Sequence, residues 1–212
     1  GFFTLEMSRL AIMQRLVGSE ARINSEKLRS GMLKPSDFHN LTEAASLIYE
    51  APLYIQDTSD IRLLDLRAQA RRAKAQFGIE IIFVDYLTLV RPENSEIPRH
   101  EQIAEISRSL KSLARELEIP VVALSQVRRE TEGKHPTLAD LRESGSIEQD
   151  ADVVIFLHRE RIDQSGEGGK AAPAVIRTEV IVAKQRNGPI GTVELAFIPQ
   201  YTRFEELTQE SP

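Results

Sequence analysis

The sequence predicts an α/β fold, in which helices cover both faces of a mostly parallel sheet and an antiparallel hairpin follows at the C-terminal end. Short aliphatic runs alternate with longer segments of helical periodicity, a pattern typical of parallel strands connected by helices. The last two strand-like runs instead flank Asn187-Gly188, and Asn-Gly is the dipeptide most typical of a tight hairpin turn. The fold class follows from these two observations.

The expected strands are runs rich in aliphatic and aromatic residues. They cover residues 2–5, 53–55, 81–84, 121–124, 153–157, 175–183 and 192–198. The clearest helix has its apolar residues three and four positions apart, at Ile103, Ile106, Leu110, Leu113 and Leu117. Further helices are expected over 8–20, over 35–49, and from about 63 to a stop at Gly78, with Asp60 or Ser59 as the N-cap.

Composition narrows the class of protein. A chain of 212 residues forms one domain or at most two small ones. The absence of cysteine excludes a disulfide scaffold, a thiolate metal site and a cysteine nucleophile, and it fits a reducing cytoplasm. No apolar run approaches membrane-spanning length. The net charge of −5 gives no bulk attraction to nucleic acid, so any such binding needs a local patch. The four histidines show no metal-ligand spacing.

Polar residues follow several of the expected strands. Glu6 follows the first strand, Asp85 ends the run 81–84, and Ser125-Gln126 follows the run 121–124. In parallel sheets ligands bind at the carboxyl ends of the strands. Asp85 is placed where it could orient water on Mg²⁺, Glu6 could act as general base, and Gln126 could contact a γ-phosphate. Taken singly, an acid after an aliphatic run more often caps the loop that follows it.

A phosphate-binding P-loop is missing from the sequence. That motif requires Gly-x-x-x-x-Gly-Lys-Ser/Thr. The nearest candidate is Gly169-Lys170, but Gln164 stands where the first glycine belongs and Ala171 where the hydroxyl belongs.

Longer motifs carry a family resemblance. They are Phe3-Thr4-Leu5-Glu6-Met7-Ser8, Ile82-Phe83-Val84-Asp85-Tyr86-Leu87, Ala123-Leu124-Ser125-Gln126, the block from Asp140 to Asp152, and Ala183-Lys184-Gln185-Arg186-Asn187-Gly188-Pro189. In this order they resemble, over essentially the whole chain, the C-terminal RecA-like motor domain of the DnaB family of bacterial replicative DNA helicases. The blocks from Arg142 to Asp152 and from Lys184 to Gly188 are the most specific.

The resemblance implies a hexameric ring that hydrolyses ATP with Mg²⁺ between subunits, translocates on single-stranded DNA, and has primase and a helicase loader as partners. It implies Glu6 as catalytic base, Asp85 as the Walker B acid that holds Mg²⁺ through water, and Gln126 as the γ-phosphate sensor. Lys184 and Arg186 match finger residues that reach the neighbouring subunit's ATP.

Further residues match positions near ligands in the family. Arg142, Glu143 and Gly145 fall on the segment that faces DNA, Arg128 and Arg129 could add charge to it, and Arg15 matches a position beside the nucleotide base. Plainer interpretations stay open: Gly145 as a helix stop, Arg15 as an exposed side chain, and Lys184 with Arg186 as a basic pair on an edge strand. The spacing of two puts Lys184 and Arg186 on one side of a strand.

The sequence departs from the family at its start, because the family's first strand, P-loop and P-loop helix would precede Gly1. We therefore expect the run 2–5 to pair with a strand outside this sequence, and these residues by themselves to be inactive as an ATPase. Two alternatives remain: another RecA-like ATPase, such as a recombinase or repair regulator, and a non-catalytic RecA-like assembly module.

Overall fold

The computed structural model describes residues 1–127, 133–141, 145–159 and 174–207, which fall into two compact units. The first unit contains a parallel sheet with α4 (Leu63–Phe77), α5 (Arg99–Leu117) and α6 (Gly145–Asp150). The second contains an antiparallel sheet with α2 (Ser25–Ser30). Two helices, α1 (Arg9–Glu20) and α3 (Pro35–Glu50), contribute residues to both units.

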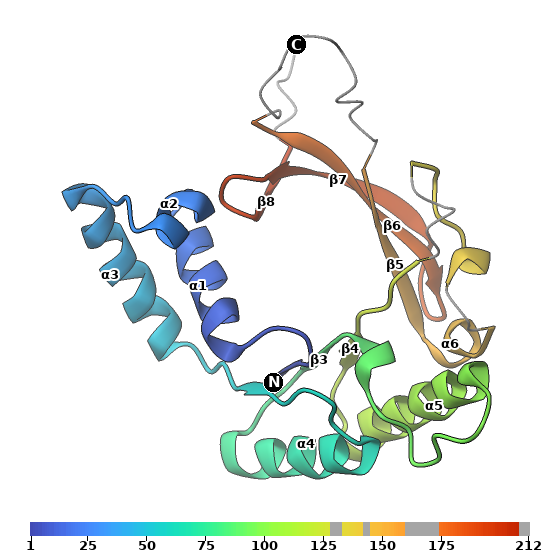
Figure 1. Ribbon diagram of the computed structural model, residues 1–212. Helices are drawn as coiled ribbons and strands as arrows, with labels where there is room; N and C mark the ends of the chain where they lie inside the picture. The colour runs from blue at the N-terminus through green and yellow to red at the C-terminus, as the bar shows by residue number, and fades with distance from the viewer. Residues whose placement is uncertain (128–132, 142–144, 160–173, 208–212) are drawn as a thin grey trace. The chain divides into compact units, whose positions relative to one another are not determined.

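The parallel sheet has the strand order β2-β1-β3-β4, and every neighbouring pair in it is parallel. Its strands are β1 (Phe2–Thr4), β2 (Ile55–Asp57), β3 (Ile82–Asp85) and β4 (Val121–Ala123). Helices α4 and α5 lie side by side along one face of the sheet (Figure 1). Short 3-10 helices follow β3 at Leu87–Leu89 and precede α6 at Leu138–Asp140.

The core of this unit lies between the sheet and α4 and α5. The predicted stripe of α5 is buried at Ile103, Ile106, Leu110 and Leu113, so this helix is confirmed. Helix α4 adds Leu63, Leu66, Ala70 and Ala73, and the strands add Phe3, Leu5, Ile82 and Val84. Gly78 ends α4 in the left-handed conformation with φ 61°, as the sequence predicts.

The expected N-cap of α4 is wrong. Arg62 occupies the cap position, and Leu63 N–H donates to the carbonyl of Arg91 at 2.9 Å. Leu64 N–H donates to Glu93 Oε1, also at 2.9 Å. These acceptors lie about 29 residues ahead in the sequence, so local spacing could not reveal them. Asp60 instead forms an ion pair with Arg91 at 2.9 Å.

The expectation for the start of the chain is also wrong. Strand β1 is hydrogen-bonded to β2 on one side and to β3 on the other. Both of its edges are therefore paired within this sequence. Its apolar character reflects burial in the middle of the sheet, where Phe3 is fully buried. Strands β2 and β4 are the edges, and Val122 and Leu124 near the β4 edge are about two-fifths exposed.

The antiparallel sheet has the order β5-β6-β7-β8. Its strands are β5 (Val153–His158), β6 (Ile176–Gln185), β7 (Gly191–Ile198) and β8 (Arg203–Glu206). The predicted hairpin joins β6 to β7, with Val182 opposite Gly191. The structure differs from the expectation in that these strands form a sheet of their own, which also takes in β5 and the unpredicted β8.

In the second unit, ion pairs tie the end of α1 to β8. Arg203 pairs with Glu20 at 3.3 Å, and Arg22 with Glu205 at 2.8 Å. The short helix α2, which the sequence analysis missed, is capped by Asn24, whose Oδ1 accepts from the amide of Glu26 at 2.8 Å.

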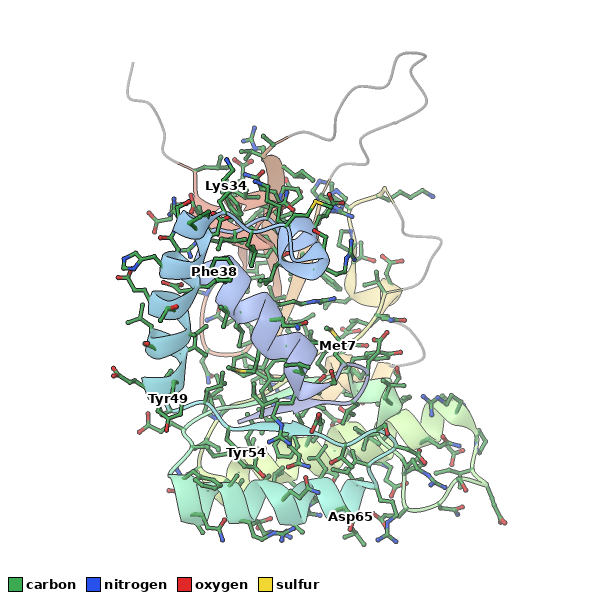
Figure 2. The ribbon with its side chains drawn as sticks, turned by 60° about the vertical axis from the view of Figure 1, so that its left-hand side comes forward. Met7, Lys34, Phe38, Tyr49, Tyr54 and Asp65 are labelled. Atoms are coloured by element: carbon green, nitrogen blue, oxygen red, sulfur yellow. The ribbon has the colours of Figure 1, made fainter. Side chains whose placement is uncertain are left out.

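Helix α3 matches its prediction and presents large apolar residues to solvent, among them Phe38 and Tyr49, which are 57% and 89% exposed (Figure 2). Within the part of the chain that the structure describes, none of the helices combines the length and apolar composition needed to cross a membrane.

Candidate functional site

The carboxyl ends of β1, β3 and β4 meet at one edge of the parallel sheet. Thr4 lies opposite Asp85 in the register, and Leu5 N–H donates to the carbonyl of Asp85 at 2.8 Å. On the other side of β3, Leu124 N–H donates to the carbonyl of Val84 at 2.9 Å. Three residues singled out in the sequence, Glu6, Asp85 and Gln126, therefore follow or end neighbouring strands at the same edge.

A buried hydroxyl shapes the turn that carries Glu6. Thr4 is 1% exposed; its Oγ1 donates to the carbonyl of Met7 at 2.9 Å and accepts from the amide of Met7 at 3.2 Å. Met7 is labelled in Figure 2, where the chain passes from β1 toward α1. Both hydrogen bonds close a short loop around Leu5 and Glu6, and Glu6 is exposed at its outer side. This arrangement leaves the carboxylate accessible to solvent.

Asp85 and Ser125 both carry oxygen donors at the carboxyl ends of neighbouring strands. Asp85 is half-buried at the end of β3, and its peptide bond to Tyr86 is cis. Ser125 Oγ, which follows β4, is buried without a hydrogen-bond partner among the described residues. Carboxylate and hydroxyl oxygens are the donors that Mg²⁺ accepts, directly or through its water shell. The residues present therefore fit a magnesium ion, although the sequence analysis gave Ser125 no role.

Asp57 also lies at this edge, and the sequence analysis missed it. It ends β2 opposite Thr4, accepts from the amide of Arg9 at 2.8 Å and pairs with the guanidinium of Arg9 at 3.7 Å. The hydrogen bond from Arg9 lowers the pKa of Asp57 below its ordinary value. Asp57 thus holds the start of α1. The signal was an acid after an apolar run, as at Asp85, but the strand lies two residues later than expected.

The two predicted finger residues lie in the second unit, at the end of β6. Lys184 is opposite Val154, and the next pair joins Ile155 to Val182, so a β-bulge leaves Ala183 of β6 without an opposite residue. Arg186 follows the last residue of β6; its amide donates to the carbonyl of Asp152 at 2.9 Å, and its Nε lies 3.6 Å from Asp152 Oδ1. Asp152 is therefore an ion-pair partner of Arg186 that the sequence analysis did not identify.

The remaining predicted site residues are only partly described. Arg128, Arg129, Arg142 and Glu143 lie outside the described residues, as do Gly169 and Lys170. Gly145 begins α6, so its interpretation as a helix stop is wrong. Gly145 is exposed, and no described atom lies within 4 Å of the place that a Cβ would take. Arg15 is an exposed residue of α1.

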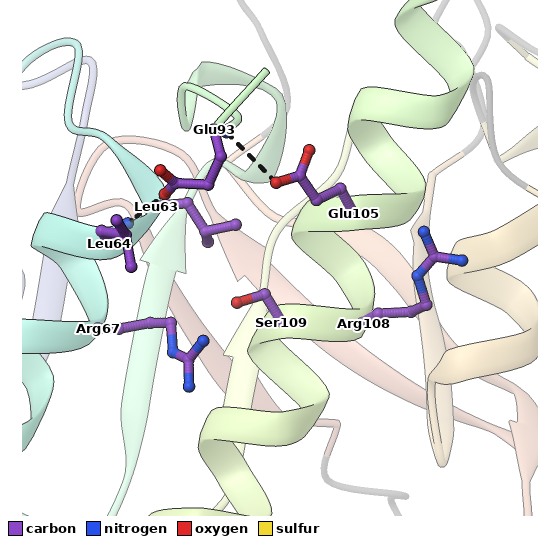
Figure 3. Close-up of a pocket in the computed structure, with 7 residues that line it drawn as sticks. All are labelled: Leu63, Leu64, Arg67, Glu93, Glu105, Arg108 and Ser109. Carbon is purple, nitrogen blue, oxygen red and sulfur yellow. Dashed lines mark hydrogen bonds between the residues drawn. The ribbon is translucent and has the colours of Figure 1, made fainter. Parts of the chain in front are cut away.

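A hollow of about 370 Å³ lies between α4 and α5 (Figure 3). Its lining residues are Leu63, Leu64, Arg67, Glu93, Glu105, Arg108 and Ser109. Glu93 connects the two helices, because its carboxylate accepts from Leu64 and its amide donates to Glu105 Oε1 at 3.3 Å. None of the predicted site residues lines this hollow, so it is a separate feature.

Comparisons with known proteins agree with the motifs. The family model of the DnaB-like helicase C terminal domain matches residues 1–206. The replicative DNA helicase DnaB of Treponema pallidum is 56% identical over 96% of this chain, and the replicative DNA helicase DnaC of Bacillus subtilis is 44% identical over 97% of it. The chain spans 44% and 45% of the lengths of these two relatives.

Solved structures have the same fold. One of them, described as an ATPase domain, aligns with a TM-score of 0.87 and 36% identity, over 97% of this chain and 73% of that one. A DnaB-like replicative helicase, described with its interactions with primase, gives the same TM-score and identity over 97% of this chain and 50% of that one. These structures confirm the predicted RecA-like α/β fold class. The chain belongs to the DnaB-like helicase C-terminal domain family.

Proposed function

We propose that this chain is the motor portion of a hexameric replicative DNA helicase, in which ATP hydrolysis between subunits drives translocation on single-stranded DNA and duplex unwinding. The observation that carries the proposal is the convergence of Glu6, Asp85 and Gln126 at one sheet edge, on three neighbouring strands. The family relationship supports the substrate class.

The three residues have different tasks in this proposal. Bound Mg²⁺ and ATP supply the charge neutralisation and the phosphoryl group. Asp85 would hold the metal's water shell, and the buried hydroxyl of Ser125, which follows the neighbouring strand, is a further oxygen donor at this edge. Glu6 would accept the proton of the attacking water. Gln126 would donate a hydrogen bond to a γ-phosphate oxygen, and losing this bond after hydrolysis would change the position of the DNA-binding loops. The P-loop that would bind the phosphates is not encoded in these 212 residues, so by themselves they should not hydrolyse ATP.

The next part of the proposal concerns two basic residues that act on a neighbouring subunit. Lys184 and Arg186 act on the ATP of the adjacent subunit, where an arginine stabilises the charge that develops on the phosphoryl group. The backbone hydrogen bond and the ion pair with Asp152 support this assignment, because they attach Arg186 to the start of β5 at the end of the β6 strand. Arg15 lies beside the nucleotide base in this proposal.

The family relationship is the basis on which we propose DNA and protein partners. Arg142, Glu143 and Gly145, with Arg128 and Arg129, are proposed to follow the backbone of single-stranded DNA without reading bases. One structural relative is described with its interactions with primase, so we propose primase as a partner, together with a helicase loader. The ring would work in the cytoplasm, where the chromosome is replicated.

The catalytic assignment is tested with Glu6→Gln in the full-length protein that carries this chain. We expect ATP and Mg²⁺ binding to be retained and the steady-state ATPase rate to fall about 10²–10⁴-fold, the usual cost of losing a general base. The matched control is Glu43→Gln, at an exposed position of α3, which should leave the rate unchanged. A Glu6→Gln enzyme that turns over like wild type would overturn the assignment. A wild-type protein without ATPase activity would favour the non-catalytic assembly module.

The trans role of Arg186 is tested by mixing subunits. Rings of Arg186→Ala alone and of Glu6→Gln alone should both be inactive, because arginine fingers contribute about 10³–10⁵ in rate. Mixed rings should recover part of the DNA-stimulated ATPase activity, since some interfaces then combine an intact Glu6 with an intact Arg186. Arg29→Ala, an exposed arginine of α2, is the control. If native mass spectrometry shows mixed rings but no activity returns at any ratio, Arg186 does not act in trans.

A further inference from the structure

Two facing residues of the antiparallel sheet form the base of a cluster that the sequence spacing did not reveal. His158 ends β5 and lies directly opposite Glu179 of β6 in the register. Directly opposed residues of an antiparallel pair project from the same face, with Cβ atoms about 5 Å apart. His158 is 8% exposed, so its imidazole is largely removed from water beside a half-buried carboxylate.

A second histidine completes the cluster from a different segment. His135 belongs to the described segment 133–137 of the same compact unit, and its ring centroid lies 4.5 Å from that of His158. Its Nε2 is 3.3 Å from Glu179 Oε2. One ligand atom from each of the three side chains lies within 4.8 Å of the other two. Two imidazoles and one carboxylate therefore converge, although a 3-10 helix, α6 and most of β5 separate His135 from His158 in the sequence.

We propose that His135, His158 and Glu179 form a binding site for a divalent transition metal of the Zn²⁺ class. Zn²⁺ binds His nitrogen and Glu oxygen at about 2.0–2.2 Å, so two ligands of a tetrahedral ion lie about 3.3–3.5 Å apart. The distance from His135 Nε2 to Glu179 Oε2 already has this value. Three protein ligands leave the fourth position for water.

The donor set also selects the class of metal. Mg²⁺ and Ca²⁺ prefer oxygen ligands throughout, whereas imidazole favours Zn²⁺, Ni²⁺ and Cu²⁺. The neighbouring carboxylate of Glu194, opposite Glu179 on β7, forms an ion pair with Arg177, so it does not compete for the ion.

The proposed site is accessible to an ion from solvent, and an ion bound there would have a structural role. His135 has 68% of its side chain exposed, so an ion can enter from solvent on that side, while His158 and Glu179 belong to paired strands that are already ordered. A bound ion would fix segment 133–137 to the β5–β6 ladder. None of the three ligands is among the residues proposed to act on ATP, and all three belong to the second unit.

Titration of the full-length protein with Zn²⁺ tests the proposal, with excess Mg²⁺ present and without nucleotide, so that the ATP site does not take up the probe. Calorimetry should give a binding event that His135→Ala, His158→Ala and Glu179→Gln each weaken at least 10-fold. The chain offers matched controls in His39→Ala and His100→Ala, because these histidines lie outside the cluster and should leave the affinity unchanged.

Co²⁺ supplies a second readout that does not depend on a heat signal. In wild type it should give the intense visible absorption of a tetrahedral or five-coordinate ion, and His135→Ala, at an exposed position that folding tolerates, should abolish it. Absence of Zn²⁺ binding in wild type would overturn the proposal. So would binding that the three ligand variants leave unchanged, since the ion would then bind elsewhere on the protein.

Discussion

The buried hydroxyl of Thr4 offers a sharp test of how the fold positions the proposed catalytic base. Thr4→Val keeps the shape of the side chain and removes the oxygen that bonds both the carbonyl and the amide of Met7. Each such hydrogen bond contributes about 0.5–1.5 kcal/mol net, so the two together should contribute about 1–3 kcal/mol to the free energy of unfolding. The change leaves the apolar contacts of the 1% exposed side chain in place.

The same substitution should slow catalysis, because Glu6 lies in the loop that these hydrogen bonds close. A misplacement of about 1 Å at a reacting group costs about 10²-fold in rate. In the full-length protein we therefore expect Thr4→Val to lower kcat for ATP by about 10–100-fold while the affinity for ATP stays the same. Steady-state ATPase assays and nucleotide titrations measure the two quantities separately.

Thr4→Ser is the matched control, because it keeps the hydroxyl and removes only the methyl group. It should lower the free energy of unfolding by about 0.8 kcal/mol or somewhat more, with kcat close to wild type. Urea unfolding of both variants supplies the stability comparison. If Thr4→Val turned over like wild type, or if Thr4→Ser lost as much activity as Thr4→Val, the hydroxyl would not be what positions Glu6.

Two further predictions concern other charged residues. Asp85→Ala should remove most of the gain in nucleotide affinity that Mg²⁺ provides, because it deletes the acid beside the metal's water shell; an unchanged ratio of Kd values with and without Mg²⁺ would contradict this. Arg71, together with Arg67, holds the pKa of Glu116 at about 2, below its ordinary 4.5. The stabilisation from this depressed pKa is complete above about pH 4.5 and is lost as the pH falls toward 2, so Glu116→Gln should destabilise the protein at pH 7 and converge with wild type in acid. Urea midpoints that stay equally far apart from about pH 6 to about pH 3 would refute this ion pair's contribution.

Features that depend on local repetition could be predicted from the sequence. The stripe from Ile103 to Leu113 defines α5, and the acids after short aliphatic runs place Glu6 and Asp85 at one edge, because parallel strands end together. For the apolar run at the start of the chain, the sequence predicts a partner strand that the structure does not require. A strand that is buried in the middle of a sheet and a strand that pairs with a missing neighbour can have the same apolar composition. Only the strand register shows that β1 is central.

Features that depend on distant residues could not be predicted. Glu93 satisfies the start of α4 from beyond β3, and Asp57 holds α1 from the neighbouring strand. His135, His158 and Glu179 come together only because a segment before α6 returns to the end of the β5–β6 pair. Periodicity and motif spacing describe neighbours along the chain, and these contacts join residues that are not neighbours.

The anchoring of the loop between β1 and α1 has a mechanical consequence. At one end of this loop, the hydroxyl of Thr4 in β1 is hydrogen-bonded to Met7. At the other end, the carboxylate of Asp57 accepts a hydrogen bond from the amide of Arg9. Glu6 thus lies in a short loop that is held at both ends, three residues before α1 begins. A displacement of α1 along its axis would be transmitted to the carboxylate instead of being absorbed by the loop, so hydrolysis would become sensitive to force applied to that helix.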